Sequence, residues 1–281
     1  MTTTPLRLGF IVEEAYRRSR MPSAVAAELE ASGHIVTLIE PQRSLTSVGD
    51  VAAQRFDGVI LRTLSGGPGL DLLIAYAAAG TTTVNDAAAV TRVRNKLAMT
   101  ATARARGIPV PDTYFATDPR LLDELPDGCF PLVVKPSDGG FGRAVRLLED
   151  RAALASLQAE PSTSCGLLAQ PWVRNSGYDL KLYSTGQGVH AVRRRSSLMG
   201  GLDGERERID VSASMAELAR RIGAAFDLEV YGADIVEGAE GLVVVDVNDF
   251  PSFGTISEAP REVAVTIAGI VRSRRAQGSA W

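Results

Sequence analysis

Cysteine, histidine and lysine are all scarce in this chain of 281 residues. The two cysteines, Cys129 and Cys165, lie far apart without a CxxC spacing, and His34 and His190 are the only histidines. This set cannot form a zinc site, because structural zinc needs four clustered thiolate or imidazole ligands. Two unpaired cysteines fit a reducing compartment, so we expect a cytoplasmic protein.

Long apolar runs and an excess of basic charge are also missing. The longest apolar segments, such as LLIAYAAAG and LVVVDV, are too short to span a bilayer, and MTTTPLRLGF does not read as a signal peptide. With 30 basic and 33 acidic residues, the formal net charge is -3. We therefore expect no membrane and no nucleic-acid partner. The length suits two or three associated lobes.

The shortage of lysine is informative because arginine is plentiful. Only three of the 30 basic residues are lysines, namely Lys96, Lys135 and Lys181. Arginine and lysine are not interchangeable at phosphate sites, where a compact point charge can be required. Drift in base composition would also leave a few scattered lysines. All three, however, lie in the motifs described below.

Strand and helix patterns alternate over the first 90 residues. LRLGFIV, HIVTLIE, FDGVILRT and TTTVND are expected strands, and MPSAVAAELEASG and LDLLIAYAAAG are expected helices. Strands separated by helices indicate parallel βαβ units, and hence an open α/β lobe over residues 1–90. The turn after the first strand lacks GxGxxG, which argues against a dinucleotide-binding dehydrogenase.

The remaining chain has a more antiparallel pattern. RVRNKLAMTATARARG is expected to be one helix, and FPLVVKP and AVRLLE a hairpin, within a central lobe over residues 91–170. In the C-terminal lobe, residues 171–281, DLKLYST and VHAVRRRS flank a GQG turn and YGADIVEG and GLVVVDVN flank a tighter one. Ser214 and Glu217 suggest a capping box before MAELARRIGAAF. The fold class is therefore α/β for the first lobe and α+β for the other two.

A glycine-rich turn follows an apolar strand in VVKPSDGGFGRAV. The strand delivers Lys135, and the loop offers Ser137, Gly139, Gly140 and Gly142, whose backbone amides can approach phosphate oxygens closely. The order differs from a Walker A loop, because the lysine precedes the glycines. An ordinary hairpin turn would give the same composition.

Acidic and amide side chains interrupt the last two apolar strands. Asp246 and Asn248 are two residues apart, so they leave the same face of their strand, and Asp234 on the neighbouring strand can meet them. Hard oxygen ligands of this kind suit Mg²⁺, which takes one or two carboxylates together with substrate phosphates. A solvated strand end is the alternative, although Asp and Asn are poor strand residues.

Basic side chains gather on the preceding hairpin. Lys181 lies within DLKLY, and alternation along the facing strand places Arg193 and Arg195 on one face and Arg194 on the other. We expect Arg193 and Arg195 to face inward, where positive charge would favour phosphates or an activated carboxylate. For Arg194 we expect a solvated position.

Taken in order, these parts resemble the ATP-grasp superfamily. The motifs are Lys96 on a helix, Lys135 with its glycine loop, the strand LLAQPWV, the pair DLKLY and AVRRRSSL, and the terminal DVN. The likeness is strongest to RimK-type carboxylate–amine ligases and to the inositol trisphosphate kinases that share this fold. It implies that two α+β lobes hold ATP between them, beside an N-terminal parallel-sheet lobe.

The resemblance also implies roles for individual residues. Lys96 and Lys135 would contact ATP phosphates, Gln170, Trp172 and Val173 would lie along the adenine edge, and Asp179 would belong to the nucleotide site. Asp234, Asp246 and Asn248 would hold Mg²⁺, as two ions that Mn²⁺ can replace. The sequence departs from the ligases where Gln170 and Asp246 stand in place of the usual Glu.

Two activities follow from the resemblance. In a ligase, ATP phosphorylates a carboxylate on a small molecule or peptide, and an amine co-substrate displaces phosphate to form an amide. Arg193 and Arg195 would then stabilise the transferring phosphoryl group, and Lys181 would bind the carboxylate. In an inositol or polyol phosphate kinase, the same groups would serve transfer to a hydroxyl, and DVNDFPSF is closer to those enzymes. We expect the ligase, because it is the commoner chemistry in the superfamily. Dimers and tetramers are both common among such enzymes, and the sequence does not distinguish between them.

Overall fold

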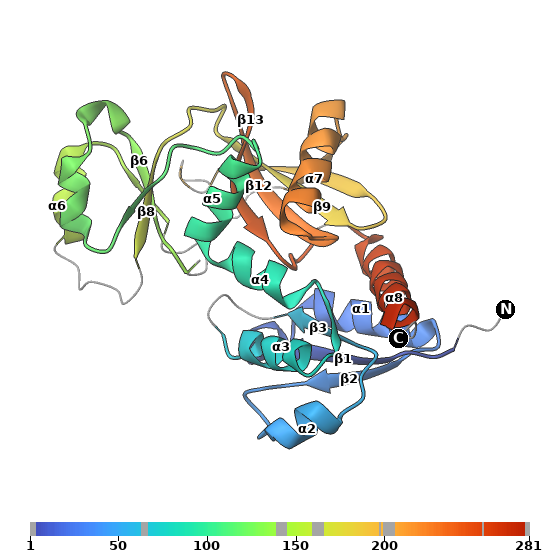
Figure 1. Ribbon diagram of the computed structural model, residues 1–281. Helices are drawn as coiled ribbons and strands as arrows, with labels where there is room; N and C mark the ends of the chain where they lie inside the picture. The colour runs from blue at the N-terminus through green and yellow to red at the C-terminus, as the bar shows by residue number, and fades with distance from the viewer. Residues whose placement is uncertain are drawn as a thin grey trace.

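Three β-sheets and the helices around them form the computed structural model (Figure 1). It describes residues 4–62, 67–138, 145–158, 166–196, 198, 206–254 and 256–278. Within these ranges, no helix is both long and apolar enough to cross a membrane.

The first sheet is parallel, with strand order β2-β1-β3-β4, as the alternating pattern predicts. Its strands are β1 (Arg7–Val12), β2 (Ile35–Ile39), β3 (Gly58–Arg62) and β4 (Thr82–Val84). The intervening helices are η1 (Glu14–Tyr16), α1 (Arg20–Ala31), α2 (Val48–Ala53) and α3 (Gly69–Ala78). β1 is buried at every position after its first residue, since helices cover both faces of the sheet.

The second sheet is a smaller antiparallel one, with strand order β5-β8-β6-β7. Its strands are β5 (Tyr114–Ala116), β6 (Leu132–Pro136), β7 (Arg146–Leu148) and β8 (Leu167–Pro171). Helix α6 (Arg151–Gln158) and the 3-10 turns η2 (Pro119–Glu124) and η3 (Asp127–Cys129) belong to this lobe. Its core, which includes Leu132, Leu154 and Ala169, is separate from the other cores.

The third sheet has five strands in the order β11-β10-β9-β12-β13, and each strand is antiparallel to its neighbour. The strands are β9 (Tyr178–Thr185), β10 (Val189–Arg195), β11 (Glu207–Ile209), β12 (Val230–Gly238) and β13 (Gly241–Asn248). The helices α4 (Ala87–Arg94), α5 (Lys96–Ala105) and α7 (Ala213–Phe226) pack with this sheet, and α8 (Ala259–Gly278) follows it. All three predicted hairpins, β6–β7, β9–β10 and β12–β13, are confirmed.

Two local predictions are wrong. The single helix expected at RVRNKLAMTATARARG is broken at Asn95, whose side chain accepts a hydrogen bond from the Ala98 amide and so caps α5. The N-cap of α7 is Ser212, not Ser214, because the Ser212 hydroxyl accepts from the Met215 amide. Glu217 pairs with Arg220 instead of closing a capping box. Propensity patterns locate helices better than their end residues.

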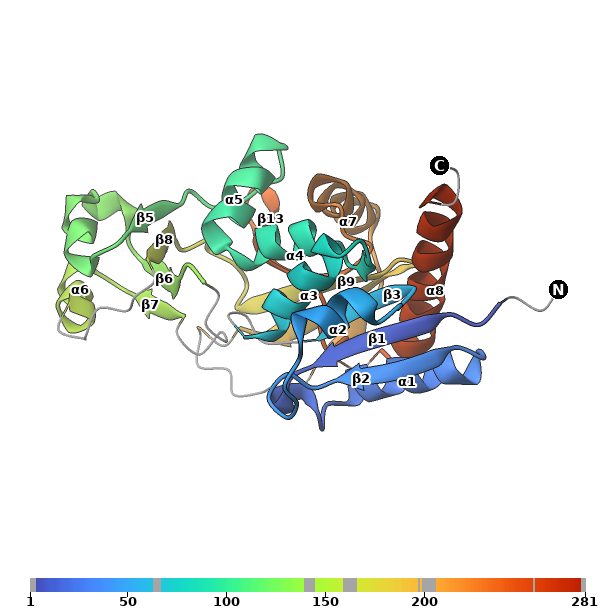
Figure 2. The same cartoon turned by 60° about the horizontal axis from the view of Figure 1, so that its bottom comes forward.

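The first and third sheets are tied together by buried polar contacts. The Asn85 side chain donates to the carbonyls of Val230 at 2.6 Å and Asp249 at 2.5 Å, and its oxygen accepts from the amides of Glu229 and Val230. Helix α8 packs on α1, so the C-terminal helix shares a core with the first sheet (Figure 2). The division into lobes at residues 90 and 170 stays a prediction, since α4, α5 and α8 pack across it.

A buried ion pair at the same junction predicts a large effect on stability. Arg94 holds Asp249 through two hydrogen bonds of 3.0 and 2.9 Å, and each side chain is about a tenth exposed. Arg94→Met would leave a buried carboxylate without this partner, so we expect it to lower the free energy of unfolding by about 3–5 kcal/mol. Urea denaturation would measure the change.

Two controls accompany that measurement. Arg94→Met/Asp249→Leu removes both charges, and we expect it to recover most of the loss. Arg220→Ala breaks an exposed pair, with side chains 69% and 52% exposed, and should change stability by about 0.5 kcal/mol or less. Equal changes in the free energy of unfolding for Arg94→Met and Arg220→Ala would show that the buried pair contributes no more to stability than the exposed one.

Candidate active site

One face of the five-stranded sheet carries most of the polar residues singled out by the sequence. Residues directly opposite each other in neighbouring strands point to the same face. The register places Lys181 opposite Asp234, and Asp234 opposite Asp246. Asp179 lies two residues before Lys181 on β9 and Asn248 two residues after Asp246 on β13, so both are on that face too. The structure therefore brings together the predicted carboxylates and Lys181.

Two lysines neutralise the paired carboxylates. Lys181 Nζ lies 2.5 Å from Asp234 Oδ1, and Lys96 Nζ forms an ion pair with Asp246 Oδ1. Burial alone would raise the pKa of Asp234, but Lys181, Arg194 and Lys96 together outweigh it and hold that pKa below its ordinary value. Burial likewise acts to lower the pKa of Lys181, and Asp234 raises it above the ordinary value. Both groups are thus kept charged inside the fold.

Lys135 reaches the same face from the opposite sheet. Its Nζ donates to the carbonyl of Val245 at 2.8 Å, and the residue is 8% exposed. The carbonyl is accessible because the β12–β13 register shifts between Asp234 and Ile235, which leaves Val245 as an extra residue in β13. Burial lowers the pKa of Lys135, and the neighbouring Lys96 acts in the same direction.

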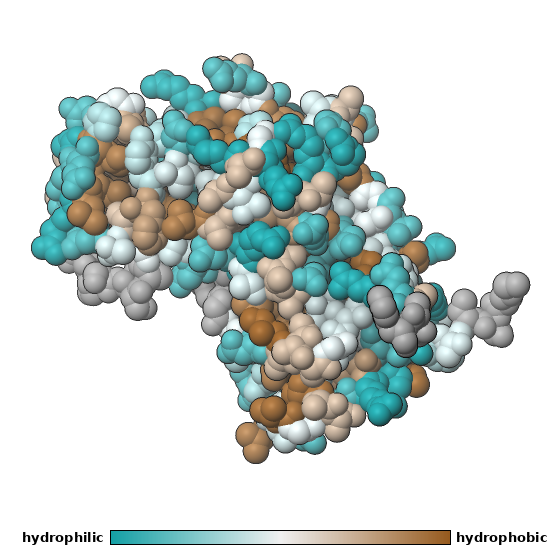
Figure 3. Space-filling view, in the orientation of Figure 1, coloured by the Kyte–Doolittle hydropathy of each residue, from teal (hydrophilic) through white to brown (hydrophobic). Residues whose placement is uncertain are grey.

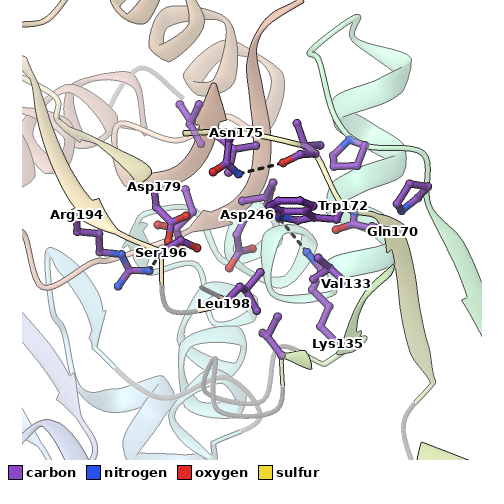
Figure 4. Close-up of a pocket in the computed structure, with 18 residues that line it drawn as sticks. Val133, Lys135, Gln170, Trp172, Asn175, Asp179, Arg194, Ser196, Leu198 and Asp246 are labelled. Atoms are coloured by element: carbon purple, nitrogen blue, oxygen red, sulfur yellow. Dashed lines mark hydrogen bonds and ion pairs between the residues drawn. The ribbon is translucent and has the colours of Figure 1, made fainter. Parts of the chain in front are cut away.

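A cavity of about 460 Å³ lies between β6 and β8 on one side and β9, β12 and β13 on the other (Figure 4). Gln170, Trp172 and Val173 line it, and the Gln170 amide donates to Thr113 Oγ1 at 2.9 Å. Its apolar side includes Val133 and Trp172, and its polar side Lys135, Asp234 and Asp246. The volume is within the range of small-ligand sites, roughly 300–1,000 Å³.

The face assignment of the three arginines is wrong. Arg194 lies opposite Asp179 and lines the cavity, with Nη2 3.5 Å from Asp179 Oδ2 (Figure 4). Arg193 and Arg195 leave the other face and are exposed. Arg193 pairs with Glu207 at 2.7 Å and stacks on the Tyr178 ring. The hairpin register decides this, since Arg194 shares a face with Lys181 and Asp234.

Asp179 is a carboxyl group whose ionised form is disfavoured where it stands. Burial raises the pKa of Asp179 above its ordinary value of 3.8, although a Ser196 hydrogen bond and Arg194 act in the opposite direction. The raised pKa means that the charge of Asp179 destabilises the fold at neutral pH. Residues kept at a cost to stability commonly belong to functional sites.

Asp179→Asn is therefore expected to raise the melting temperature at pH 7. A carboxyl with a raised folded pKa stabilises the fold when protonated, and this contribution is lost as pH rises from 3.8 toward the folded value. The gain from Asp179→Asn should accordingly be largest above the folded pKa and should shrink as pH falls below it. Melting curves from pH 3 to pH 8 would measure this; a gain independent of pH would contradict the assignment to titration.

The glycine loop lies outside the described residues at Gly139, Gly140 and Gly142. Ser137 is described: its amide donates to the Gly166 carbonyl, and its carbonyl accepts from the Lys96 amide, both at 2.8 Å. Ser137 thus connects the end of β6 to the start of α5, beside Lys135. A direct contact of Ser137 with a ligand stays a prediction.

The acidic pair fits Mg²⁺ as part of a nucleotide complex. Asp234 and Asp246 supply two carboxylates, and Asn248 supplies an amide oxygen further along β13. No group of three or more Asp, Glu, His or Cys side chains that could hold a metal occurs in the described parts of the chain. Mg²⁺ is usually held by one or two carboxylates and completed by phosphates and water, so the donor set is chemically suitable.

The sequence prediction missed three residues that line the cavity, and the hairpin register could have indicated one of them. Counting back from the GQG turn pairs Asp179 with Arg194, and this would have selected Arg194 in place of Arg193 and Arg195. Ser196 and Asn175 follow and precede the same hairpin and also line the cavity. Neither carries a sequence signal, because serine and asparagine are ordinary loop residues.

Known proteins resemble this chain in both sequence and fold. The model of the RimK-like ATP-grasp domain matches residues 93–271. A probable alpha-L-glutamate ligase of Alkalilimnicola ehrlichii is 27% identical over 268 residues, 88% of this chain and 89% of the relative. One from Shewanella frigidimarina is 28% identical over 266 residues, 87% of each chain.

Solved structures share the arrangement of lobes. A RimK domain ATP-grasp protein from Sphaerobacter thermophilus superposes with a TM-score of 0.77 at 21% identity, covering 94% of this chain and 100% of that one. The D-cycloserine synthetase DcsG gives a TM-score of 0.73 at 18% identity, over 94% and 99%. The ATP-grasp ligase PsnB, solved with a minimal precursor, Mg and ADP, superposes with a TM-score of 0.67 at 20% identity. The match covers 94% of this chain and 98% of PsnB. These likenesses establish an ATP-grasp fold.

Proposed function

We infer the reaction from one premise: this chain belongs to the RimK-like ATP-grasp family, whose model matches more than half of its length. It is an ATP-dependent carboxylate–amine ligase that forms C–N bonds. The inositol phosphate kinase alternative finds no support among the relatives described above, since the sequence relatives and PsnB are named as ligases and DcsG as a synthetase.

The finer proposal is amide formation through an acyl phosphate. A carboxylate oxygen of the substrate attacks the γ-phosphorus of ATP, and ADP leaves. The amine nitrogen of the second substrate then attacks the acyl carbon, phosphate leaves, and the amine loses a proton. The observation that carries the proposal is the meeting of Lys135, Arg194, Asp234 and Asp246 around one cavity, with Lys181 paired to Asp234. No side-chain nucleophile is required, since positioning and charge stabilisation suffice.

Individual residues take roles set by their places in the cavity. Gln170, Trp172 and Val173 would receive the adenine beside Val133. Lys135, which lines the cavity, and Lys96, which pairs with Asp246, would bind phosphate oxygens. Lys181 would bind the substrate carboxylate. Arg194 would stabilise the negative charge on the transferring phosphoryl group, a role that the sequence assigned to Arg193 and Arg195. Asp179 would orient Arg194 through their 3.5 Å contact.

Asp234, Asp246 and Asn248 would hold Mg²⁺. The ion would neutralise phosphate charge when bound. In the structure Lys96 pairs with Asp246 and Lys181 with Asp234, and Lys181 favours the ionised form of Asp234. The number of ions and replacement by Mn²⁺ remain parts of the proposal.

Amino acids or peptides are the substrates that the comparisons favour. The sequence relatives are named as probable alpha-L-glutamate ligases, and PsnB was solved with a precursor peptide. We propose that this chain joins an amine to a carboxylate of a compound of this class.

Product analysis tests the reaction. The purified protein would be incubated with ATP and Mg²⁺ and with pools of amino acids, small acids and peptides, while ADP, phosphate and product mass are recorded. Equal ADP and phosphate, dependent on both an acid and an amine, with a condensed product, would support the ligase. A product heavier by one phosphoryl group, without free phosphate, would overturn it.

A further inference from the structure

Strand β2 lies at the open edge of the parallel sheet and has no pairing partner among the described strands on its outer side. Its register with β1 runs from Ile35 to Ile39 without a shift, so the edge carries no bulge. It also contains no proline and no charged residue, since its sequence is IVTLI. Proteins commonly protect edge strands with these features, and an edge without them is prone to pair with another strand.

The outer side of β2 presents backbone groups at two positions. The Ile35 amide donates to the Leu6 carbonyl at 2.9 Å, so Ile35, Thr37 and Ile39 direct their backbone groups toward β1. Backbone direction alternates along a strand, and the N–H and C=O groups of Val36 and Leu38 therefore point outward. A partner strand must supply matching groups at the same spacing.

Exposed apolar side chains gather around this edge. Of the ten large hydrophobic residues that are exposed in the described chain, four lie between residues 35 and 48: Ile35 (56%), Leu38 (55%), Leu45 (101%) and Val48 (84%). Figure 3 shows hydrophobic side chains gathered at the lower end of the molecule, where Figure 1 places β2 and α2. Ile35 and Leu38 leave opposite faces of β2, so exposed apolar side chains flank the edge on both faces.

We propose that β2 pairs with β2 of a second copy of this chain, antiparallel and centred on Thr37, and thereby joins the two parallel sheets. In this register Val36 of each copy exchanges N–H and C=O bonds with Leu38 of the other, which uses the outward groups of both. Ile35 lies opposite Ile39, and Thr37 lies opposite Thr37. Every cross-strand pair on both faces is then apolar or β-branched, a combination that stabilises sheets.

The surroundings of the strand fit the same two-fold arrangement. The register brings Glu40 of one copy, which pairs with Arg17 of its own copy at 2.9 Å, toward the end of the other copy's strand. Arg272 contacts His34 at 3.4 Å at that end, so Glu40 approaches a further positive charge there. Strand pairing alone falls short of the roughly 1,200 Å² that specific interfaces bury. Leu45 and Val48, which follow β2 in the chain, add apolar surface to it.

Molar mass in solution gives the first test. By light scattering at micromolar concentration we expect twice 29.8 kDa for the unchanged protein and 29.8 kDa for Leu38→Lys. The matched control is Val265→Lys, which places the same charge at a residue 51% exposed on α8 and should remain dimeric. Circular dichroism would establish that both variants are folded. A monomeric unchanged protein, or a dimeric Leu38→Lys, would overturn the proposal.

A disulfide test fixes the register. In a background with Cys129→Ser and Cys165→Ser, Thr37→Cys should form a disulfide-linked dimer on mild oxidation, because directly opposite residues at a non-hydrogen-bonded position lie about 4.5 Å apart. Leu38→Cys should not, since its own counterpart lies beyond the roughly 7 Å that a disulfide can span. Cross-linking through Leu38→Cys but not Thr37→Cys would refute the register. Both tests are independent of ligase activity, so they can fail while the proposed function stands.

Discussion

Lys135→Met is expected to lower kcat/KM for ATP-dependent ligation by about 10²–10³-fold while the fold is retained, the loss typical when one preorganised electrostatic group is removed. Lys135 is 8% exposed and lines the cavity, and its ammonium group donates to the Val245 carbonyl. A charge held out of water acts on phosphate oxygens more strongly than a solvated one. Methionine keeps the apolar stem and removes only the charge and its hydrogen bonds.

Three measurements separate the explanations of such a loss. Phosphate release gives the rate, and thermal melting reports the fold. Quenching of Trp172 fluorescence, in a background with Trp281→Phe, reports nucleotide binding, since Trp172 lines the cavity. Lys135→Arg retains the charge with a different shape and should recover only part of the activity. A Lys135→Met protein with full activity would show that the cavity is not the phosphate site.

Arg194→Ala is expected to lower kcat by about 10²-fold or more, with little change in nucleotide binding. Arg194 lies on the sheet face shared by Lys181 and Asp234, and a cation that acts on the transferring phosphoryl group contributes mainly in the transition state. Its neighbour provides a matched control on the same strand. Arg193 faces away, pairs with Glu207 and is exposed, so Arg193→Ala should stay within about twofold of the unchanged enzyme.

Steady-state kinetics of the two variants, with ATP and the acceptor varied in turn, would decide between the faces. A lower kcat in Arg193→Ala with an unchanged kcat in Arg194→Ala would support the sequence prediction that Arg193, and not Arg194, acts on the phosphoryl group. Equal losses in both would point to a general effect of positive charge on the hairpin.

The sequence was most informative where alternation and turn length determine the geometry. The tight turn after YGADIVEG aligned Asp234 with Asp246, and the apolar residues around both made polar side chains conspicuous. The βαβ pattern similarly gave the order of strands and helices in the first sheet. Such features depend on neighbours within a few residues, and local patterns therefore predict them.

Features that depend on distant segments were not predictable in this way. Alternation separates Arg194 from Arg193, but which face is covered depends on β6 and β8, which come from another lobe. No local sequence pattern predicts the extra residue at Val245. Its carbonyl accepts a hydrogen bond from Lys135, which lies 110 positions away in the sequence. The break at Asn95 interrupts a segment rich in good helix formers, and it places Lys96 at the start of α5.

The buried contacts of Asn85 and Arg94 bear on how ATP would reach the cavity. They fasten the first sheet to the third, and α8 packed on α1 strengthens this connection. The strands and helices between residues 114 and 171 pack mainly on one another. Entry of ATP and departure of ADP would then follow from displacement of the middle sheet alone. Exclusion of water from a labile intermediate would depend on how long that sheet remains closed.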